Sequence, residues 1–388
     1  MAISHLYPTQ RPALDLNFAR QKRLDSRVTF TRGSTATYVG SDGLIKTAAS
    51  GEARFDHDPE TGESLGLLVE EARTNYFLNS NSGSTSKWNA YTGVTITQST
   101  TIAPDGSTNA IRIEATTSGQ YAETTWTAPS SATYTATIYI RSRTGADQSV
   151  RLDFSGSTGT TTQTVPASGD WVRLRDTHGD LAAAGLRYFY VQSPTNETLD
   201  VDVWGEQVEM GTFPTSYIPT SGSTVTRSAD VASMTGTNFS SWYNQSEGSI
   251  FTVARIGDLS TANQTIASAE ETASSVQFNA LGYRVGGGGS GYIGAWSYNS
   301  TGQAFFNINA GITSNTEFKA IHSYKTDDYA ASVNGSVPVT DTAGNASTTI
   351  DRLRIGAGVY GSVVTGTISR LTYYPTRLSD TQLQALTL

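Results

Sequence analysis

Two adjacent carboxylates and an arginine stand in the stretch GLLVEEARTN, residues 66–75, between an apolar run and an asparagine. A glycoside hydrolase needs a pair of carboxylates about 5–10 Å apart across the scissile bond. Glu70 and Glu71 are sequence neighbours, and neighbouring side chains of an extended chain point to opposite faces. In a helix they would still diverge by about 100°. We therefore interpret this stretch as a joint whose glutamates form ion pairs with Arg73 or Arg54.

The stretch RFDHDP, residues 54–59, brings together Asp56, His57 and Asp58, which could bind a metal ion or transfer protons. A turn at Asp58-Pro59 is an alternative explanation for the presence of these residues, since Asp and Pro are common in turns. The sequence also lacks a Gly-x-Ser-x-Gly elbow and any histidine pair at the spacing of a zinc site. We predict that the protein has no catalytic residues and is not an enzyme.

The composition indicates a β-rich protein of several domains. The chain has 388 residues, 37 glycines and 10% aromatic residues, but only 15% charged residues. Many short strands joined by polar turns have this composition. The net charge of −8 disfavours nucleic acid and anionic membranes as partners. Because there is no cysteine, disulfides and thiolate metal sites are excluded.

The sequence gives no signal for export or for membrane insertion. The N-terminal stretch has no basic region followed by an apolar core, so we expect no signal peptide. No run of about 18 apolar residues is present, so we expect no membrane-spanning segment.

Alternation of apolar and polar residues predicts an antiparallel β-sandwich over residues 76–220. In AIRIEA, Ile111 and Ile113 face one way and the charged residues face the other. The same pattern recurs along TYTATIYIRS, VRLDF, WVRLRD and LDVDVWGEQVEM. Short strands with one apolar face favour two packed sheets, and we expect jelly-roll connectivity.

A second sandwich is predicted over residues 234–388, after a linker at 221–233 that is rich in Ser and Thr. Its clearest signals are a hairpin turn at Asn334-Gly335 and a C-terminal helix with Ser379 as N-cap and Gln382 completing a capping box. Residues 1–75 are charged and poor in apolar side chains, which predicts an extended arm that needs a surface to lie against. The predicted fold class is all-β: an extended N-terminal arm, two antiparallel jelly-roll-like β-sandwiches and one short C-terminal helix.

Three parts of the chain resemble known families, and together they cover most of its length. The N-terminal pattern RVTFTRGSTATY, GEARFDHDP and GLLVEEARTN resembles the head spike or head fibre proteins of tailed phages. The middle pattern APDGSTNA, DWVRL and VWGEQVEMGTFPTSYIPTSG is similar to carbohydrate-binding-module-like sandwiches of phage structural proteins. The last pattern, YKTDDYAASVNGSVPV and ISRLTYYPTRLSDTQLQAL, resembles laminin-G or concanavalin-like domains.

The resemblance implies a virion protein that is assembled in the host cytoplasm and anchored to a capsid or other virion protein by residues 1–75. It also implies a homo-oligomer, a trimer or a dimer. We expect the attachment interface to comprise Arg20, Arg27, Phe30, Arg32, Arg54, Phe55, Leu67, Leu68, Glu70 and Arg73.

The two sandwiches are candidates for binding host-surface glycans, because aromatic rings stack on the apolar faces of sugars. The aromatic candidates are Trp88, Tyr91 and Trp126 in the first sandwich and Tyr292, Trp296 and Tyr298 in the second. Core packing is an alternative role for each ring. Both resembled sandwich classes often carry a structural Ca²⁺, and Asp105 in APDGS is the candidate ligand, although Asp-Gly there also forms a tight turn.

We therefore predict a non-enzymatic phage virion structural protein that decorates the particle and touches glycans. A tail-fibre-like adhesin that recognises host carbohydrate is the alternative, and a polysaccharide depolymerase is the third hypothesis.

Overall fold

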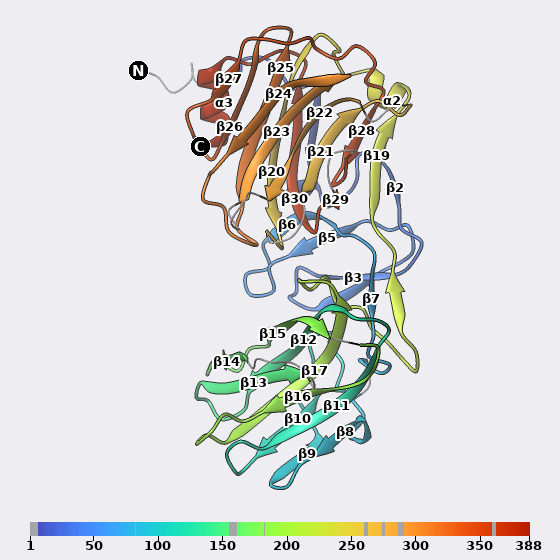
Figure 1. The fold of residues 1–388 in the computed structure, drawn as a ribbon, viewed down its shortest axis with the longest axis vertical. Coiled ribbons are helices and arrows are strands. Elements are labelled where there is room, and N and C mark those ends of the chain that lie inside the picture. The colour runs from blue at the N-terminus through green and yellow to red at the C-terminus, as the bar shows by residue number, and fades with distance from the viewer. Residues whose placement is uncertain are drawn as a thin grey trace. The chain divides into compact units, whose positions relative to one another are not determined.

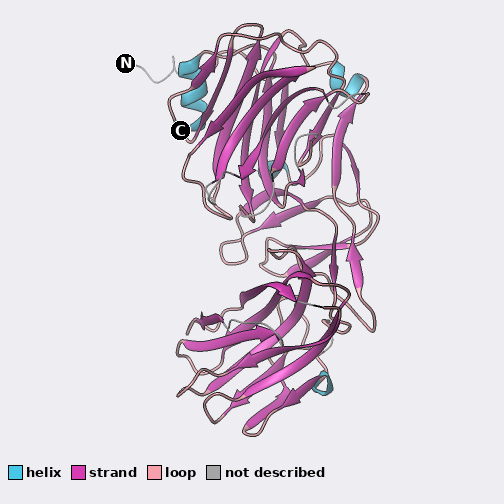
Figure 2. Ribbon diagram, viewed as in Figure 1, coloured by secondary structure: helices cyan, strands magenta, loops and turns pink. Residues whose placement is uncertain are grey.

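The computed structural model describes residues 7–81, 83–154, 161–181, 183–259, 263–273, 276–285, 291–358 and 362–388. Strands dominate it and helices are few and short (Figure 2), so the all-β fold class is confirmed. The chain forms two compact units (Figure 1). The first, which we call the split sandwich, comprises Met1–Asp42, Ala48–Glu71 and Ser228–Leu388. The second, the inserted sandwich, comprises Gly43–Thr47 and Ala72–Arg227.

One sheet of the split sandwich has eight strands among the described residues. Strands from the N-terminal segment lie beside strands from the C-terminal part, and β1 and β6 both pair with β30. Along the sheet the order is β27 (Val339–Asp341), β26 (Tyr329–Val333), β25 (Phe318–Lys325), β20 (Glu247–Ile256), β30 (Gly366–Tyr374), β6 (Ser64–Val69) and β5 (Arg54–His57), with β1 (Leu14–Asn17) on β30.

The facing sheet also has eight described strands, and it too begins with an N-terminal strand. Its order is β2 (Thr29–Thr31), β19 (Val231–Thr235), β28 (Arg352–Ile355), β21 (Gln264–Glu270), β22 (Gln277–Val285), β23 (Gly291–Asn299) and β24 (Thr301–Ile308), with β29 (Ser362–Val363) parallel to β21. Three short helices complete this unit: α1 (Phe18–Gln21), α2 (Thr237–Ser240) and α3 (Asp380–Thr387).

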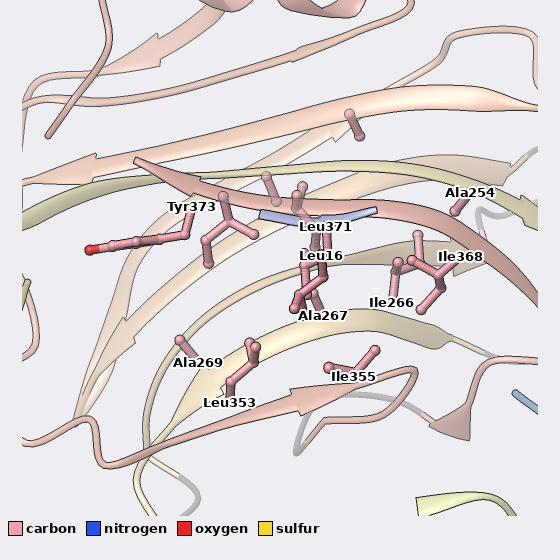
Figure 3. Close-up of a cluster of buried hydrophobic side chains, with 14 of the residues drawn as sticks. Leu16, Ala254, Ile266, Ala267, Ala269, Leu353, Ile355, Ile368, Leu371 and Tyr373 are labelled. Carbon is pink, nitrogen blue, oxygen red and sulfur yellow. The ribbon is translucent and has the colours of Figure 1, made fainter. Parts of the chain in front are cut away.

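N-terminal side chains lie inside the core of the split sandwich. Leu16 from β1 belongs to the same buried cluster as Ala267, Leu353 and Leu371, which come from both sheets (Figure 3). Leu67 from β6 is fully buried in this cluster as well. Since burying one such side chain contributes about 1.5–3 kcal/mol, the N-terminal strands are part of what makes this unit stable.

This arrangement corrects the predicted boundaries 1–75 and 221–233. Residues 14–69 do not form a separate extended arm, because β1, β2, β5 and β6 complete the two sheets. The predicted linker contains β18 (Val225–Arg227), which pairs with β7 (Arg73–Asn75), and the start of β19. The low apolar content of the N-terminal segment was misleading, because Leu14, Leu16, Phe18, Leu67 and Val69 are buried in a core that the distant C-terminal strands supply.

Gly66 shows how closely the N-terminal segment fits the C-terminal strands. Its backbone has φ +98°, a region that side-chain-bearing residues rarely adopt. A Cβ at this position would also collide with the backbone of Ile368 and Ser369 on β30. The glycine that opens the stretch GLLVEEARTN therefore permits the pairing of β6 with β30.

The inserted sandwich consists of two five-stranded sheets among the described residues. One has the order β15 (Val172–Leu181), β12 (Ala132–Ser142), β17 (Leu199–Met210), β10 (Ile111–Ala115) and β9 (Val94–Gln98). The other has the order β14 (Thr161–Val165), β13 (Gln148–Phe154), β16 (Gly185–Gln192), β11 (Tyr121–Ala128) and β8 (Trp88–Ala90), the last preceded by the 3₁₀ helix η2 (Thr85–Lys87). From β10 to β17 the chain crosses to the other sheet at every step except between β13 and β14, which is the predicted jelly-roll connectivity.

The alternation read from the sequence is confirmed in this unit. Ile111 and Ile113 are buried while Arg112 and Glu114 are not. Side chains that were predicted to face inward on the other strands, such as Ile138, Leu152 and Val203, are fully buried in one cluster.

Two local predictions in the split sandwich are also confirmed. Asn334 and Gly335 both have positive φ, as a tight hairpin turn between β26 and β27 requires. The helix α3 begins with the predicted capping box of Ser379 and Gln382.

Of the remaining strands, β3 covers Ala36–Val39 and β4 covers Ile45–Ala48. No helix in the part of the chain that the structure describes has the length and apolar character to cross a membrane.

We predict that a fragment of residues 76–388 loses the split sandwich and keeps the inserted one. The deletion removes β1, β2, β5 and β6 and exposes the core they cover. Calorimetry of the full chain should show an unfolding transition for each sandwich, whereas the fragment should show one. A fragment of residues 72–227 is the control and should retain that same transition. Two intact transitions in the 76–388 fragment would contradict the architecture.

Candidate functional site

Glu70 belongs to a buried network of four charged side chains in the split sandwich. Arg32 Nη1 lies 3.0 Å from Asp230 Oδ1, and Arg54 Nη2 lies 2.5 Å from Asp230 Oδ2. Arg54 Nη1 also donates to Glu70 Oε2 at 2.7 Å. None of the four side chains is more than 3% exposed. The predicted pairing of Glu70 with Arg54 is therefore confirmed, but it is buried and not at the surface.

The backbone closes the same network. The amide of Glu70 donates to Asp230 Oδ2 at 2.9 Å, and the amide of Asp230 donates to the Glu70 carbonyl at 2.9 Å. Burial alone would lower the pKa of Arg54, but Glu70 and Asp230 raise it further than burial lowers it, so the guanidinium stays charged. Two cations and two anions balance, and no substrate can reach them. Glu70 is a structural residue.

The residues of RFDHDP are also accounted for structurally. Burial raises the pKa of Asp56 to about 6, and its carboxylate accepts a hydrogen bond from the Val39 amide at 2.7 Å. His57 Nδ1 lies 3.0 Å from the Val39 carbonyl oxygen. The Asp58 carboxylate accepts from the Glu60 and Thr61 amides, which is the turn predicted there. The three side chains thus have different partners and do not converge on one point.

Half of the ten residues predicted for the attachment interface are buried within the chain itself. These are Arg32, Arg54, Leu67, Leu68 and Glu70, and none can form a surface for another protein. The prediction is wrong for these five, because the strands that carry them complete this chain's own sheets. The other five are partly or largely exposed: Arg20, Arg27, Phe30, Phe55 and Arg73.

Arg73 has an intramolecular role in the inserted sandwich. Its guanidinium lies over the ring of Phe213, 4.5 Å from the centroid, and donates to the Met210 carbonyl. It therefore anchors the start of this unit to the end of β17.

The three tryptophans predicted as glycan-stacking residues are core residues. Trp88, Trp126 and Trp296 are 4%, 2% and 0% exposed, so no ring face is open to a sugar. Trp126 packs against Tyr134 and Phe154, and Trp296 lies against Gly294, where any side chain would collide with the indole. Tyr292 and Tyr298 are half-buried, and Tyr298 stacks on Phe278. Tyr91, at 53% exposed, is the most exposed of the six candidates.

Tyr91 lies at the edge of a row of tyrosines on the outer face of the β14-β13-β16-β11-β8 sheet. Its ring stacks on Tyr121 with centroids 4.7 Å apart. Tyr121 meets Tyr190 edge to face at 5.1 Å, and Tyr190 lies parallel to Tyr188 at 6.3 Å. Strand alternation explains the row, because the intervening Phe189 points into the core. We call these four residues, Tyr91, Tyr121, Tyr188 and Tyr190, the tyrosine face.

Polar and charged side chains share this face. Glu123 is opposite Tyr190 in the pairing of β11 with β16, and Asp153 is opposite Tyr190 on its other side. Burial raises the pKa of Tyr121 and of Tyr190, and the nearby Glu123 raises both further. The two phenols therefore stay protonated and can donate hydrogen bonds.

Sequence reasoning missed Tyr121, Tyr188 and Tyr190. The signal was present in LRYFYVQ, where period-2 alternation sets Tyr188 and Tyr190 on the face opposite Phe189 and Val191. The three predicted tryptophans have the alternative role that was stated for every candidate, since large rings also fill sandwich cores.

The metal candidate Asp105 lies in a turn, where its carboxylate accepts from the Ser107 amide at 3.0 Å. Among the described residues, the group whose ligand atoms lie within 4.8 Å of one another is Asp153, Asp176 and His178. Asp176 is already hydrogen-bonded to His178 Nε2, and Asp153 accepts from the Phe154 amide at 2.7 Å. These contacts give the cluster a structural explanation.

No family model matches this chain, and no curated protein matches it. Solved structures that match part of this chain include the sialidase CBM40 of Ruminococcus gnavus bound to α2,3-sialyllactose, with 16% identity, 37% of this chain and 83% of that chain covered and a TM-score of 0.32. Domain 4 of the arabinanase AbnA from Geobacillus stearothermophilus, in complex with arabinotriose, has 14% identity, 41% and 73% covered and a TM-score of 0.30. The SAP-like pentraxin of Limulus polyphemus has 16% identity, 36% and 68% covered and a TM-score of 0.27. Likeness at this level says nothing about ligands.

We predict that Arg54→Ala destabilises the split sandwich by about 3–5 kcal/mol, because it leaves Glu70 and Asp230 buried without their shared cation. Asp15→Ala is the matched control. It breaks the Asp15–Arg370 pair, which also joins the N-terminal segment to β30 but is 40% and 38% exposed, so it should cost less than about 1 kcal/mol. Denaturant unfolding of both variants measures the difference. Equal losses of unfolding free energy in the two variants would show that the buried network stabilises the protein no more than the exposed ion pair does.

Proposed function

We propose that the protein is a non-catalytic glycan-binding protein that binds carbohydrate through the tyrosine face of its inserted sandwich. The observation that carries the proposal is the row of four tyrosines on one outer sheet face, with Tyr91 stacked on Tyr121. A pyranose ring has an apolar face of C–H groups and a rim of hydroxyls. An aromatic ring covers the former, while phenols, amides and carboxylates hydrogen-bond the latter.

The neighbouring side chains suit such a ligand. Asn89 and Glu123 face each other on β8 and β11, and Gln192 lies opposite Tyr121 on β16. The asparagine and glutamine amides can donate to and accept from vicinal hydroxyls, and the glutamate carboxylate can accept from them. Since the face extends across several strands, it can hold several consecutive sugars of a chain.

Catalysis is not part of the proposal. Among the described residues, Asp56 is the carboxyl whose pKa is raised, to about 6, as a general acid would require. It lies in the split sandwich beside the buried network, whereas the tyrosine face belongs to the inserted sandwich. The described residues therefore give no support to the hypothesis of a polysaccharide depolymerase.

The biological setting that we propose is a phage virion, as a head spike, head fibre or decoration protein. Support comes from the resemblance of the stretches RVTFTRGSTATY, GEARFDHDP and GLLVEEARTN to such proteins. Partly exposed attachment residues, such as Arg20, Arg27 and Phe55, are left for contact with a capsid protein. A tail-fibre-like adhesin uses the same tyrosine face and differs in its place on the particle.

We predict that Tyr121→Ala and Tyr190→Ala each weaken glycan binding about five- to thirtyfold, since removing one stacking ring costs about 1–2 kcal/mol. Binding is measured by calorimetric titration with the best ligand from a glycan array. Tyr292→Ala, in the split sandwich, is the matched control and should bind as the wild type does. If Tyr292→Ala loses binding and Tyr121→Ala does not, the glycan site is elsewhere and the proposal is wrong.

A second prediction tests the setting. Antibodies against the folded protein should label intact particles of the phage that encodes it, at the head for a spike or decoration protein. Labelling at the tail tip would favour the adhesin. Purified particles that contain none of the protein would contradict a virion role, but would leave the glycan-binding result unaffected.

A further inference from the structure

A polar pocket of about 310 Å³ opens in the inserted sandwich beside the 3₁₀ helix η2. Its wall includes the side chains of Leu78, Asn79, Ser86, Asn89 and Thr125, and Lys87 and Glu206 lie within it. The volume is at the lower end of the range for small-molecule sites, about 300–1,000 Å³. It suits a short ligand of one or two sugar rings.

The pocket adjoins the tyrosine face. Thr125 lines the pocket and lies directly opposite Tyr188 in the pairing of β11 with β16. Asn89 also lines it and lies opposite Glu123. Residues that are opposite each other in an antiparallel pair point to the same side of the sheet. Thr125 and Asn89 therefore place one rim of the pocket on the side of the sheet that carries the tyrosines, while Thr124, which also lines the pocket, points to the other side. A glycan that lies on the rings can place one sugar over this rim and into the pocket.

Lys87 and Glu206, the two charged residues of the pocket, form an ion pair with each other. Lys87 Nζ lies 2.8 Å from Glu206 Oε2 and also donates to the Asn79 carbonyl at 3.0 Å. Trp88 Nε1 donates to Glu206 Oε1 at 3.0 Å. The side chains of Lys87 and Glu206 are 15% and 3% exposed. Trp88 was predicted to stack on a sugar, but it is buried and donates a hydrogen bond to the Glu206 carboxylate instead.

An anionic sugar would meet an unfavourable environment here. The Lys87 charge is cancelled by Glu206, so a carboxylate that entered would gain no net attraction and would lose its hydration. Glu123, on the adjoining face, adds a repulsive charge. Hydroxyl groups meet no such cost, because the asparagine amides, the Ser86 and Thr125 hydroxyls and the third N–H of Lys87 can donate or accept hydrogen bonds.

We infer that this pocket is a sugar subsite that selects a neutral hexose or N-acetylhexosamine and rejects hexuronic and sialic acids. The inference rests on the proposed glycan binding by the tyrosine face and adds the class of sugar that the surface accepts. The Lys87–Glu206 pair sets this selectivity by making the pocket polar without net charge.

The test uses the full chain and an array of matched oligosaccharide pairs whose members differ only in carrying a hexose or the corresponding hexuronic acid. We expect the wild type to bind the neutral member of the best pair at least tenfold more tightly. Glu206→Gln removes the countercharge of Lys87 and should shift the ratio toward the acidic member by about tenfold or more. Thr125→Lys, at an exposed position of the pocket wall, should shift it in the same direction without disturbing the buried pair.

Tyr121→Ala separates this inference from the proposed function, since it should weaken both members of a pair equally. If the wild type binds both members equally or prefers the acidic one, the subsite inference is overturned. It is also overturned if Tyr121→Ala abolishes binding while neither Glu206→Gln nor Thr125→Lys changes the ratio, although the tyrosine face would then stand. Failure of the wild type to bind any member would overturn the proposed function together with the subsite.

Discussion

The burial of four charges around Asp230 is the constraint on which the split sandwich depends. Two arginines from the N-terminal segment, Arg32 and Arg54, share this one carboxylate, which the chain supplies almost 180 residues after Arg54. A lone arginine in this interior would cost several kcal/mol, so the N-terminal strands are stable only when Asp230 and Glu70 are in place. The network therefore couples the two sequence segments of one sandwich more specifically than apolar packing alone.

Much of the fold was predictable from local sequence. Period-2 alternation located the strands of the inserted sandwich, and Asn334-Gly335 and Ser379 identified a hairpin and a helix start. These signals are local because they depend on the residues of one strand or turn. The partner of β1 and β6 was not predictable in this way, since β30 lies about 360 residues after β1 and about 300 residues after β6. A segment with few apolar residues was therefore interpreted as an arm, although its core is supplied from a distance.

The candidate site was predictable only in part. Tyr91 was identified by residue type, and its exposure supports that choice. Trp88 and Trp126 were identified by the same rule and are buried, because a sequence pattern does not distinguish a ring that fills a core from one that faces solvent. The contact of Tyr121 with Tyr190 joins two strands about 70 residues apart in sequence. The pocket around Glu206 likewise depends on β17 reaching η2, which the strand pairing determines.

The position of the Glu70–Asp230 backbone pair has a consequence for how such a protein can diversify. Glu70 lies two residues before Ala72 and Asp230 three residues after Arg227, the ends of the longer segment of the inserted sandwich. Two hydrogen bonds of 2.9 Å, one between their backbones and one from the Glu70 amide to the Asp230 carboxylate, hold these two junctions together. A domain whose ends lie a strand spacing apart, about 5 Å, could occupy the same junction without altering the network. Glu70 and Asp230, rather than residues of the inserted sandwich, therefore close the split sandwich at this junction.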